Sequence, residues 1–263
     1  IEYLNALSKV TADVAPYITI PTTAGTGAEI TFGGGIHPET NAPAMTIRSI
    51  HVQPDLAICD PDFTMTLPPR LTAATGMDAL THCVEGFLSS NANPPTEAIA
   101  LDGTRRVVDF IERAVEDGSD REARLNMSMA ALQGGMAIYM GLGPIHALSM
   151  CFGDSPLHHG TLVTVAMPAV MRFYNGKLAD SVLERYAAAM NLRADKDAGN
   201  RIADAVAEMN AKLSLPSTVR EMGYEKTDVD RMIQEAYESP FNLASPIRPS
   251  LADYEKLVTE VLG

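Results

Sequence analysis

Four side chains in this sequence have the chemistry and the spacing of metal ligands: Asp78, His82, His146 and His159. Asp78 and His82 lie four residues apart in GMDALTHCVEGF, a segment of good helix formers, so both project from one helical face and can hold one ion. Three imidazoles and one carboxylate suit a divalent transition ion such as Fe²⁺ or Zn²⁺, which binds nitrogen and oxygen at roughly 2.0–2.2 Å. A further coordination position could then stay open for a substrate.

The other two histidines stand at predicted helix starts. His146 follows Pro144 in GLGPIHALSM, and proline is tolerated in the first turn of a helix. His159 precedes Gly160 at a junction between a loop and a helix. Taken singly, an aspartate and a histidine four residues apart arise often by chance, and a lone histidine is usually a surface or core residue. The four together favour a metal site.

The pattern of residues predicts two regions that position these side chains. Residues 1–67 resemble the C-terminal remainder of an α/β dinucleotide-binding domain, with strands at Tyr17–Pro21, Ala44–Ser49 and Asp55–Asp60, the first and last of them buried. Residues 68–263 show helical periodicity throughout, beginning with a long helix at Pro68 and Pro69. We therefore expect an incomplete α/β portion followed by an all-α domain that carries the metal ligands.

Composition excludes several classes of protein. The net charge of −13 disfavours nucleic acid or anionic membrane as a partner. No run of about 18 apolar residues predicts a membrane span, and no secretion signal opens the chain. Three cysteines, an odd number without ligand-like spacing, are typical of a reducing compartment, so a cytoplasmic protein is expected.

Several long motifs, in order and correctly spaced, resemble the iron-containing (group III) alcohol dehydrogenases. They are IPTTAGTGAE (Ile20–Glu29), LPPRLTAATGMDALTHCVEGF (Leu67–Phe87), NANPPTEAIALDG (Asn91–Gly103), GLGPIHALS (Gly141–Ser149) and LHHGTL (Leu157–Leu162). Within that family, HCVEGFLSS, ALDGTRR and DREARLNM are similar to the branch that contains bacterial 4-hydroxybutyrate dehydrogenases.

This resemblance implies a dehydroquinate synthase-like two-domain architecture and a homo-oligomer, expected to be a dimer. It also implies an oxidoreductase that transfers a hydride between NAD(P) and a small primary alcohol or aldehyde, the alcohol being a hydroxy acid in the 4-hydroxybutyrate branch. The metal would act as a Lewis acid, held by Asp78, His82, His146 and His159. The glycine- and threonine-rich loop after the first strand would contact the cofactor through Thr22, Thr23, Thr26 and Thr31. His158 matches a variable position and is interpreted as structural.

Two departures from the family pattern concern proton transfer and cofactor binding. Met150 stands where the family often has a histidine assigned to proton relay, and a thioether cannot transfer protons. Ala44 stands where a lysine commonly contacts the cofactor ribose. The glycine turn that holds the pyrophosphate in relatives is also absent, since the run Gly33–Gly35 comes after the loop and no helix is predicted to follow it.

Two alternatives remain open at this stage. Dehydroquinate synthase and glycerol dehydrogenase share the two-domain plan with a metal and NAD, although GMDALTH together with IPTTAGTGAE favours the alcohol dehydrogenases. The other alternative is a catalytically impaired or non-enzymatic metal-binding homologue that lacks a complete cofactor domain. Because IEYLNALSKV is typical of the middle of a domain, we expect a truncated enzyme.

Overall fold

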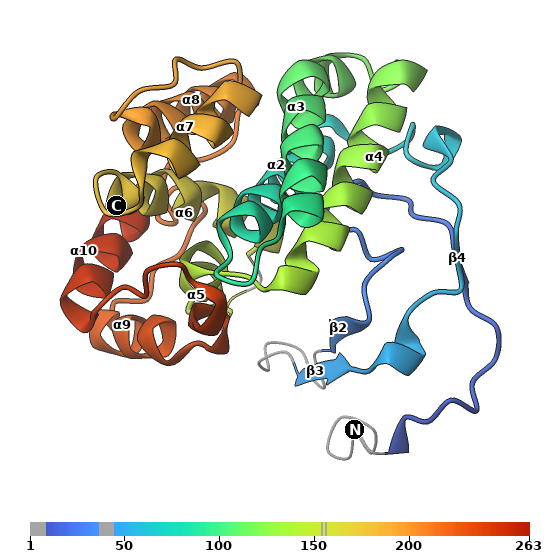
Figure 1. Cartoon of the computed structure of the whole chain (residues 1–263), viewed down its shortest axis with the longest axis horizontal. Coiled ribbons are helices and arrows are strands. Elements are labelled where there is room, and N and C mark those ends of the chain that lie inside the picture. Colours follow the sequence, from blue (N-terminus) through green and yellow to red (C-terminus); the bar gives the residue numbers. More distant parts are fainter. Residues whose placement is uncertain (1–8, 37–44, 154, 156) are drawn as a thin grey trace.

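The computed structural model describes residues 9–36, 45–153, 155 and 157–263, with only the backbone of Thr46. Ala44 and the segment 1–8 lie outside the described residues. Most of the described chain is helical, and the few short strands gather at one corner of the molecule (Figure 1).

The helical region begins where the sequence predicts it, at the tandem prolines. The helices are α2 (Pro69–Leu88), α3 (Pro94–Glu116), α4 (Arg121–Ala137), α5 (Pro144–Met150), α6 (His159–Tyr174), α7 (Asp180–Ala189), α8 (Ala198–Lys212), α9 (Val229–Glu238) and α10 (Leu251–Leu262). No helix within the described ranges is both long enough and apolar enough to cross a membrane.

Helix ends follow from local capping. The side chain of Asn93 accepts a hydrogen bond from the backbone N–H of Thr96, and the Thr96 hydroxyl bonds back to the backbone N–H of Asn93. This capping box satisfies two backbone donors that a helix start leaves unpaired, so α3 begins at Pro94. Ser250 and Asp253 form the same box at the start of α10.

Helix α2 lies at the centre of the helical region and packs against α3, α4 and α6. Every residue of α2 from Gly76 to Leu88 is buried. A helix buried on all sides is normally apolar all round, yet the buried part of this one carries two acidic side chains, Asp78 and Glu85, and the imidazole of His82. Since buried charges need partners, these three residues mark the part of the fold where polar chemistry is concentrated.

The strands form two separate pairs in the described residues. β1 (Ile18–Thr19) pairs in parallel with β4 (Leu56–Ala57), and β2 (Gly33–Ile36) pairs antiparallel with β3 (Met45–Arg48). The prediction that the first and last strands are buried is wrong for these residues. Ile18 is 56% exposed and Leu56 is 51% exposed, because no described segment covers this side of the pair.

Candidate metal centre

One face of α2 presents three ionisable side chains in a row. Asp78, His82 and Glu85 are separated by four and then three residues, the spacing that places side chains on the same face of a helix. All three are buried. The packing of α2 between its neighbours therefore removes these groups from water and leaves them to interact with what α5 and α6 bring to this face.

Helices α5 and α6 bring one histidine each, both where the sequence predicts a helix start. Gly141, at φ +108°, turns the chain before α5, and Pro144 is the first residue of that helix. His146 follows two residues later and is buried. His159 is the first residue of α6, and 46% of its side chain is exposed. The cluster is thus closed on the side of α2 and α5 and open at His159.

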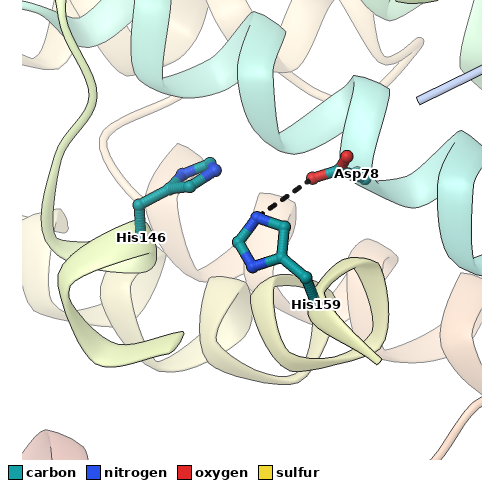
Figure 2. Close-up of side chains that lie close together, drawn as sticks. All are labelled: Asp78, His146 and His159. Carbon is teal, nitrogen blue, oxygen red and sulfur yellow. Dashed lines mark ion pairs between the residues drawn. The ribbon is translucent and has the colours of Figure 1, made fainter. Parts of the chain in front are cut away.

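Three of the four predicted ligands form a tight group. Asp78, His146 and His159 each offer one ligand atom, and these atoms all lie within 4.8 Å of one another (Figure 2). Nε2 of His159 lies 4.0 Å from Oδ1 of Asp78. Ligand atoms around a tetrahedral ion lie roughly 3.3–3.6 Å apart, from bond lengths of about 2.0–2.2 Å, so only a small contraction would close the group around an ion.

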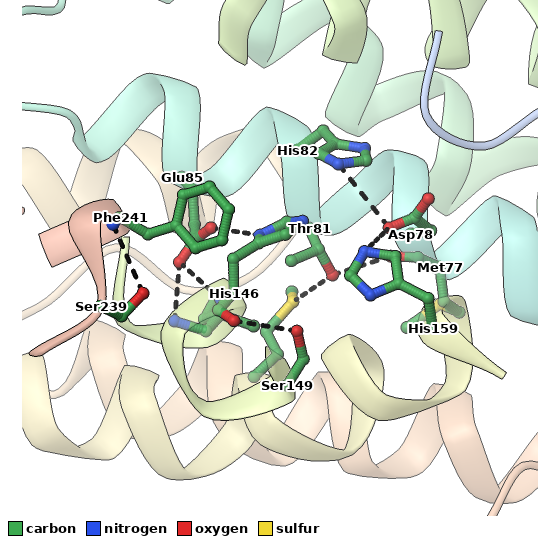
Figure 3. Close-up of polar contacts among 12 residues, drawn as sticks. Met77, Asp78, Thr81, His82, Glu85, His146, Ser149, His159, Ser239 and Phe241 are labelled. Atoms are coloured by element: carbon green, nitrogen blue, oxygen red, sulfur yellow. Dashed lines mark hydrogen bonds and ion pairs between the residues drawn. The ribbon is translucent and has the colours of Figure 1, made fainter. Parts of the chain in front are cut away.

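His82 lies beside this group of three residues. Its Nε2 is 3.7 Å from Oδ1 of Asp78, and its ring stacks on His146 with centroids 4.9 Å apart and planes at 28° (Figure 3). The three predicted histidines therefore lie around the carboxylate of the fourth predicted residue, Asp78, and the His82 side chain is buried.

Two atoms of the cluster have the chemistry and the surroundings of metal ligands. Oδ1 of Asp78 and Nε2 of His146 are buried, and no described residue forms a hydrogen bond with either atom. Buried polar atoms are nearly always paired in folded proteins, so two unpaired atoms in one cluster require a reason. A divalent cation bound between them satisfies both, since a carboxylate oxygen and an imidazole nitrogen are among its ordinary ligands.

Burial and the neighbouring groups of the cluster shift the pKa values of its ionisable side chains. Burial alone would raise the pKa of Asp78, but the three imidazoles and the Thr26 hydroxyl outweigh it and lower that pKa. Burial lowers the pKa of His82 despite the nearby Asp78 carboxylate. Although its side chain is almost half exposed, His159 also has a lowered pKa, because desolvation outweighs the attraction of Asp78. A neutral His82, a neutral His159 and an ionised Asp78 are the forms that bind a cation.

Glu85 is a residue of this site that the sequence analysis missed. Its Oε2 lies 2.5 Å from Nδ1 of His146, and its Oε1 accepts hydrogen bonds from the backbone N–H groups of Ile145, at 2.7 Å, and His146, at 3.4 Å. The spacing of three residues from His82 would have placed Glu85 on the ligand-bearing face. This carboxylate outweighs burial and raises the pKa of His146.

The threonine-rich loop contacts the same cluster from the strand side. Thr26 Oγ1 donates a hydrogen bond to Asp78 Oδ2 at 3.2 Å, which leaves Oδ1 facing the histidines. Thr22 and Thr23 are exposed, and Thr31 donates to the carbonyl of Ala28. The loop predicted to contact the cofactor is therefore joined to the candidate metal centre through the hydrogen bond from Thr26 to Asp78.

His158 and Met150 lie at the borders of the site. His158 is exposed and precedes α6, where its carbonyl accepts the backbone N–H groups of Thr161 and Leu162. Met150 ends α5 and is 42% exposed. Neither residue belongs to the group formed by Asp78, His146 and His159.

Comparison with known proteins gives concordant results. Residues 72–262 match the Fe-containing alcohol dehydrogenase family, C-terminal part, and residues 2–61 match iron-containing alcohol dehydrogenase. The chain is 42% identical to the 4-hydroxybutyrate dehydrogenase of Cupriavidus necator, over 96% of this chain and 67% of that protein. It is 31% identical to the NAD-dependent methanol dehydrogenase of Bacillus methanolicus, over 98% of this chain and 69% of that protein.

A solved structure agrees with this grouping. The crystal structure of a 1,3-propanediol oxidoreductase superimposes with a TM-score of 0.87 and 30% identity, over 94% of this chain and 66% of that one. The chain thus spans about two thirds of the length of these relatives. The family resemblance carried by the sequence motifs is confirmed, and the chain belongs to the iron-containing alcohol dehydrogenase family.

Proposed function

We propose that the protein is a metal-dependent, NAD(P)-linked oxidoreductase that interconverts a small primary alcohol and its aldehyde by hydride transfer. The observation that carries this proposal is a pair of buried ligand atoms, Asp78 Oδ1 and His146 Nε2, that form no hydrogen bond with any described residue. They lie in a chain of the iron-containing alcohol dehydrogenase family. Neither the comparisons nor the described residues favour a non-enzymatic homologue.

In this proposal Asp78, His82, His146 and His159 hold one Fe²⁺ or Zn²⁺. When bound, the ion supplies a Lewis acid that polarises the oxygen of the alcohol or aldehyde. Asp78 contributes the negative charge, and Thr26 fixes its carboxylate by binding Oδ2. The burial of Asp78, His82 and His146 keeps water from competing for these atoms, while the exposed side of His159 gives access to the site.

We propose that residues 1–67 belong to the nucleotide-binding domain and that residues 68–263 form the catalytic domain, in a dehydroquinate synthase-like arrangement. The loop with Thr22, Thr23, Thr26 and Thr31 would contact NAD(P), whose nicotinamide, when bound, donates or accepts the hydride. The hydrogen bond from Thr26 to Asp78 supports this, because hydride transfer requires the cofactor and the substrate carbon to lie roughly 3–3.5 Å apart. The NAD-dependence named for the Bacillus relative supports a nicotinamide cofactor.

The proposed substrate is a small alcohol. The first pair to test is 4-hydroxybutyrate and its aldehyde, because the Cupriavidus relative, at 42% identity, is named a 4-hydroxybutyrate dehydrogenase. We further propose a cytoplasmic homodimer. Cys59, Cys83 and Cys151 are an odd number of cysteines without disulfide-like spacing, which supports a reducing compartment.

The test reconstitutes the protein with Fe²⁺ or Zn²⁺ under anaerobic conditions. After removal of excess ion, elemental analysis should give one ion per chain for the wild type and substantially less for His146→Ala. His158→Ala is the matched control, because it removes an adjacent, exposed histidine from outside the group, and it should retain the ion. NAD(P)H oxidation with small aldehydes should then follow the metal content. Equal metal content in both variants would refute the ligand assignment.

A further inference from the structure

Glu85 is a buried carboxylate that joins two of the helices of the candidate metal centre. It lies on α2, three residues after His82, and is only 4% exposed. Its partners come from α5: the backbone N–H groups of Ile145 and His146 on one oxygen, and the imidazole of His146 on the other (Figure 3). Burying an ionised carboxylate is costly unless it is hydrogen-bonded, and here both oxygens are engaged.

The first oxygen of Glu85 completes the start of α5. Gly143 precedes this helix and provides no side-chain cap, so the first backbone N–H groups need another acceptor. Oε1 of Glu85 accepts from two of them. A side chain at position 143 would meet this carboxylate, since a Cβ there would lie 3.0 Å from Oε1. The carboxylate of α2 thus fixes where α5 begins and how it is oriented.

In the neutral imidazole, the second oxygen determines which nitrogen of His146 carries hydrogen. An ionised carboxylate has only acceptor atoms, so the nitrogen at Oε2, which is Nδ1, must be the donor. The other nitrogen, Nε2, then offers its lone pair toward Asp78 and His159, and it has no hydrogen-bond partner among the described residues. A histidine ligand held in this way by a carboxylate is more basic and better oriented toward its ion.

We infer that Glu85 is a positioning residue that holds His146 in the Nδ1–H tautomer and anchors α5 to α2, so that Nε2 is presented to the metal. This inference rests on the proposed function only in assigning a metal to the cluster. The hydrogen bonds that Glu85 accepts, and the tautomer that they require of neutral His146, do not depend on the ion.

Glu85→Gln separates the chemical role from a structural one. If the amide oxygen keeps the backbone bonds to α5, the amide nitrogen faces Nδ1 and donates to it. His146 must then carry its hydrogen on Nε2, where it blocks the metal. The reversed amide would point its N–H₂ group at two backbone donors, which is unfavourable. The variant preserves shape and the cap of α5 but reverses the tautomer.

The experiment measures Zn²⁺ affinity by competition with a chelator and the tautomer of His146 by long-range ¹H–¹⁵N NMR. Glu85→Gln should weaken Zn²⁺ binding by about 10- to 100-fold, the usual effect of losing such a partner, and should show the Nε2–H tautomer. The melting temperature of the metal-free chain should change little. Glu29→Gln, which neutralises another buried glutamate outside the cluster, should leave Zn²⁺ affinity within about twofold of the wild type.

Two results would overturn the inference. One is a folded Glu85→Gln variant with wild-type Zn²⁺ affinity and the Nδ1–H tautomer. The other is an Nε2–H tautomer for His146 in the wild type, which needs no variant at all. If Glu85→Gln does not fold, Glu85→Asp provides the comparison, because it keeps an acceptor-only carboxylate and should retain the Nδ1–H tautomer. A wild type that binds no Zn²⁺ would refute the proposed function, while its metal-free tautomer would still test the role of Glu85.

Discussion

Gly27 packs the threonine-rich loop against α4 and should not tolerate a side chain. It adopts φ +71°, a left-handed conformation that favours glycine. A Cβ at this position would lie 2.7 Å from Cα of Gly135 and closer still to the carbonyl oxygen of Ala131. Both neighbours are backbone atoms of a helix, so neither can move aside as a flexible side chain would.

Gly176 provides a matched control for Gly27→Ala. It also adopts φ +71°, but a Cβ there would meet no atom of the described part of the chain within 4 Å. Gly176→Ala should therefore cost only the backbone penalty, about 1 kcal/mol after the reduced entropy of the unfolded chain is included. Gly27→Ala adds the steric conflict, usually about 1–3 kcal/mol, for a total of about 2–4 kcal/mol.

The two variants are compared by thermal unfolding of the metal-free protein. For a chain of this size each kcal/mol corresponds to about 2–4 °C, so we expect a loss of roughly 2–4 °C for Gly176→Ala and roughly 4–16 °C for Gly27→Ala. If the loop detaches instead, limited proteolysis should cut residues 22–36 faster in Gly27→Ala alone. Equal melting temperatures together with equal proteolysis of this loop would refute the close packing of Gly27 on α4.

Three further predictions concern residues outside the proposed ligand set. The buried guanidinium of Arg124 donates hydrogen bonds to Thr72 Oγ1 and to the carbonyls of Leu67 and Gly118. Arg124→Met should therefore lower the free energy of unfolding by about 2–4 kcal/mol in urea titrations. Arg124→Lys should recover only part of this loss. The Tyr254 hydroxyl donates to Asn242 Oδ1 at 2.5 Å, so Tyr254→Phe should cost about 1–3 kcal/mol and leave metal content unchanged. Burial raises the pKa of Cys59 to about 11 and that of Cys83 to about 12, so few of these thiols are thiolates at pH 8. Because the thiolate is the reactive form, a thiol reagent should label both cysteines far more slowly in the native protein than in denaturant.

Sequence periodicity located the helices well because their ends depend on local chemistry. The predicted helix start at the tandem prolines is confirmed, as is the placement of His146 and His159 in the first turns of their helices. α3 begins at Pro94 because Asn93 caps it there. These features are encoded within a few residues of each helix end.

The site was harder to predict where it depends on contacts between distant segments. A glutamate in a helical segment is usually solvated, and only the position of α5 shows that Glu85 binds His146. The hydrogen bond from Thr26 to Asp78 likewise joins segments 52 residues apart. Burial of the first strand was wrongly predicted from its apolar composition, because composition does not specify whether another segment covers it.

The most direct test of the metal assignment is anomalous diffraction from crystals loaded with Zn²⁺ or Fe²⁺, recorded at the absorption edge of the ion. The predicted result is one peak per chain, with Asp78 Oδ1 and Nε2 of both His146 and His159 at roughly 2.0–2.2 Å and His82 completing the ligand set. A peak elsewhere in the molecule, or an ion at the cluster without His146 among its ligands, would contradict it.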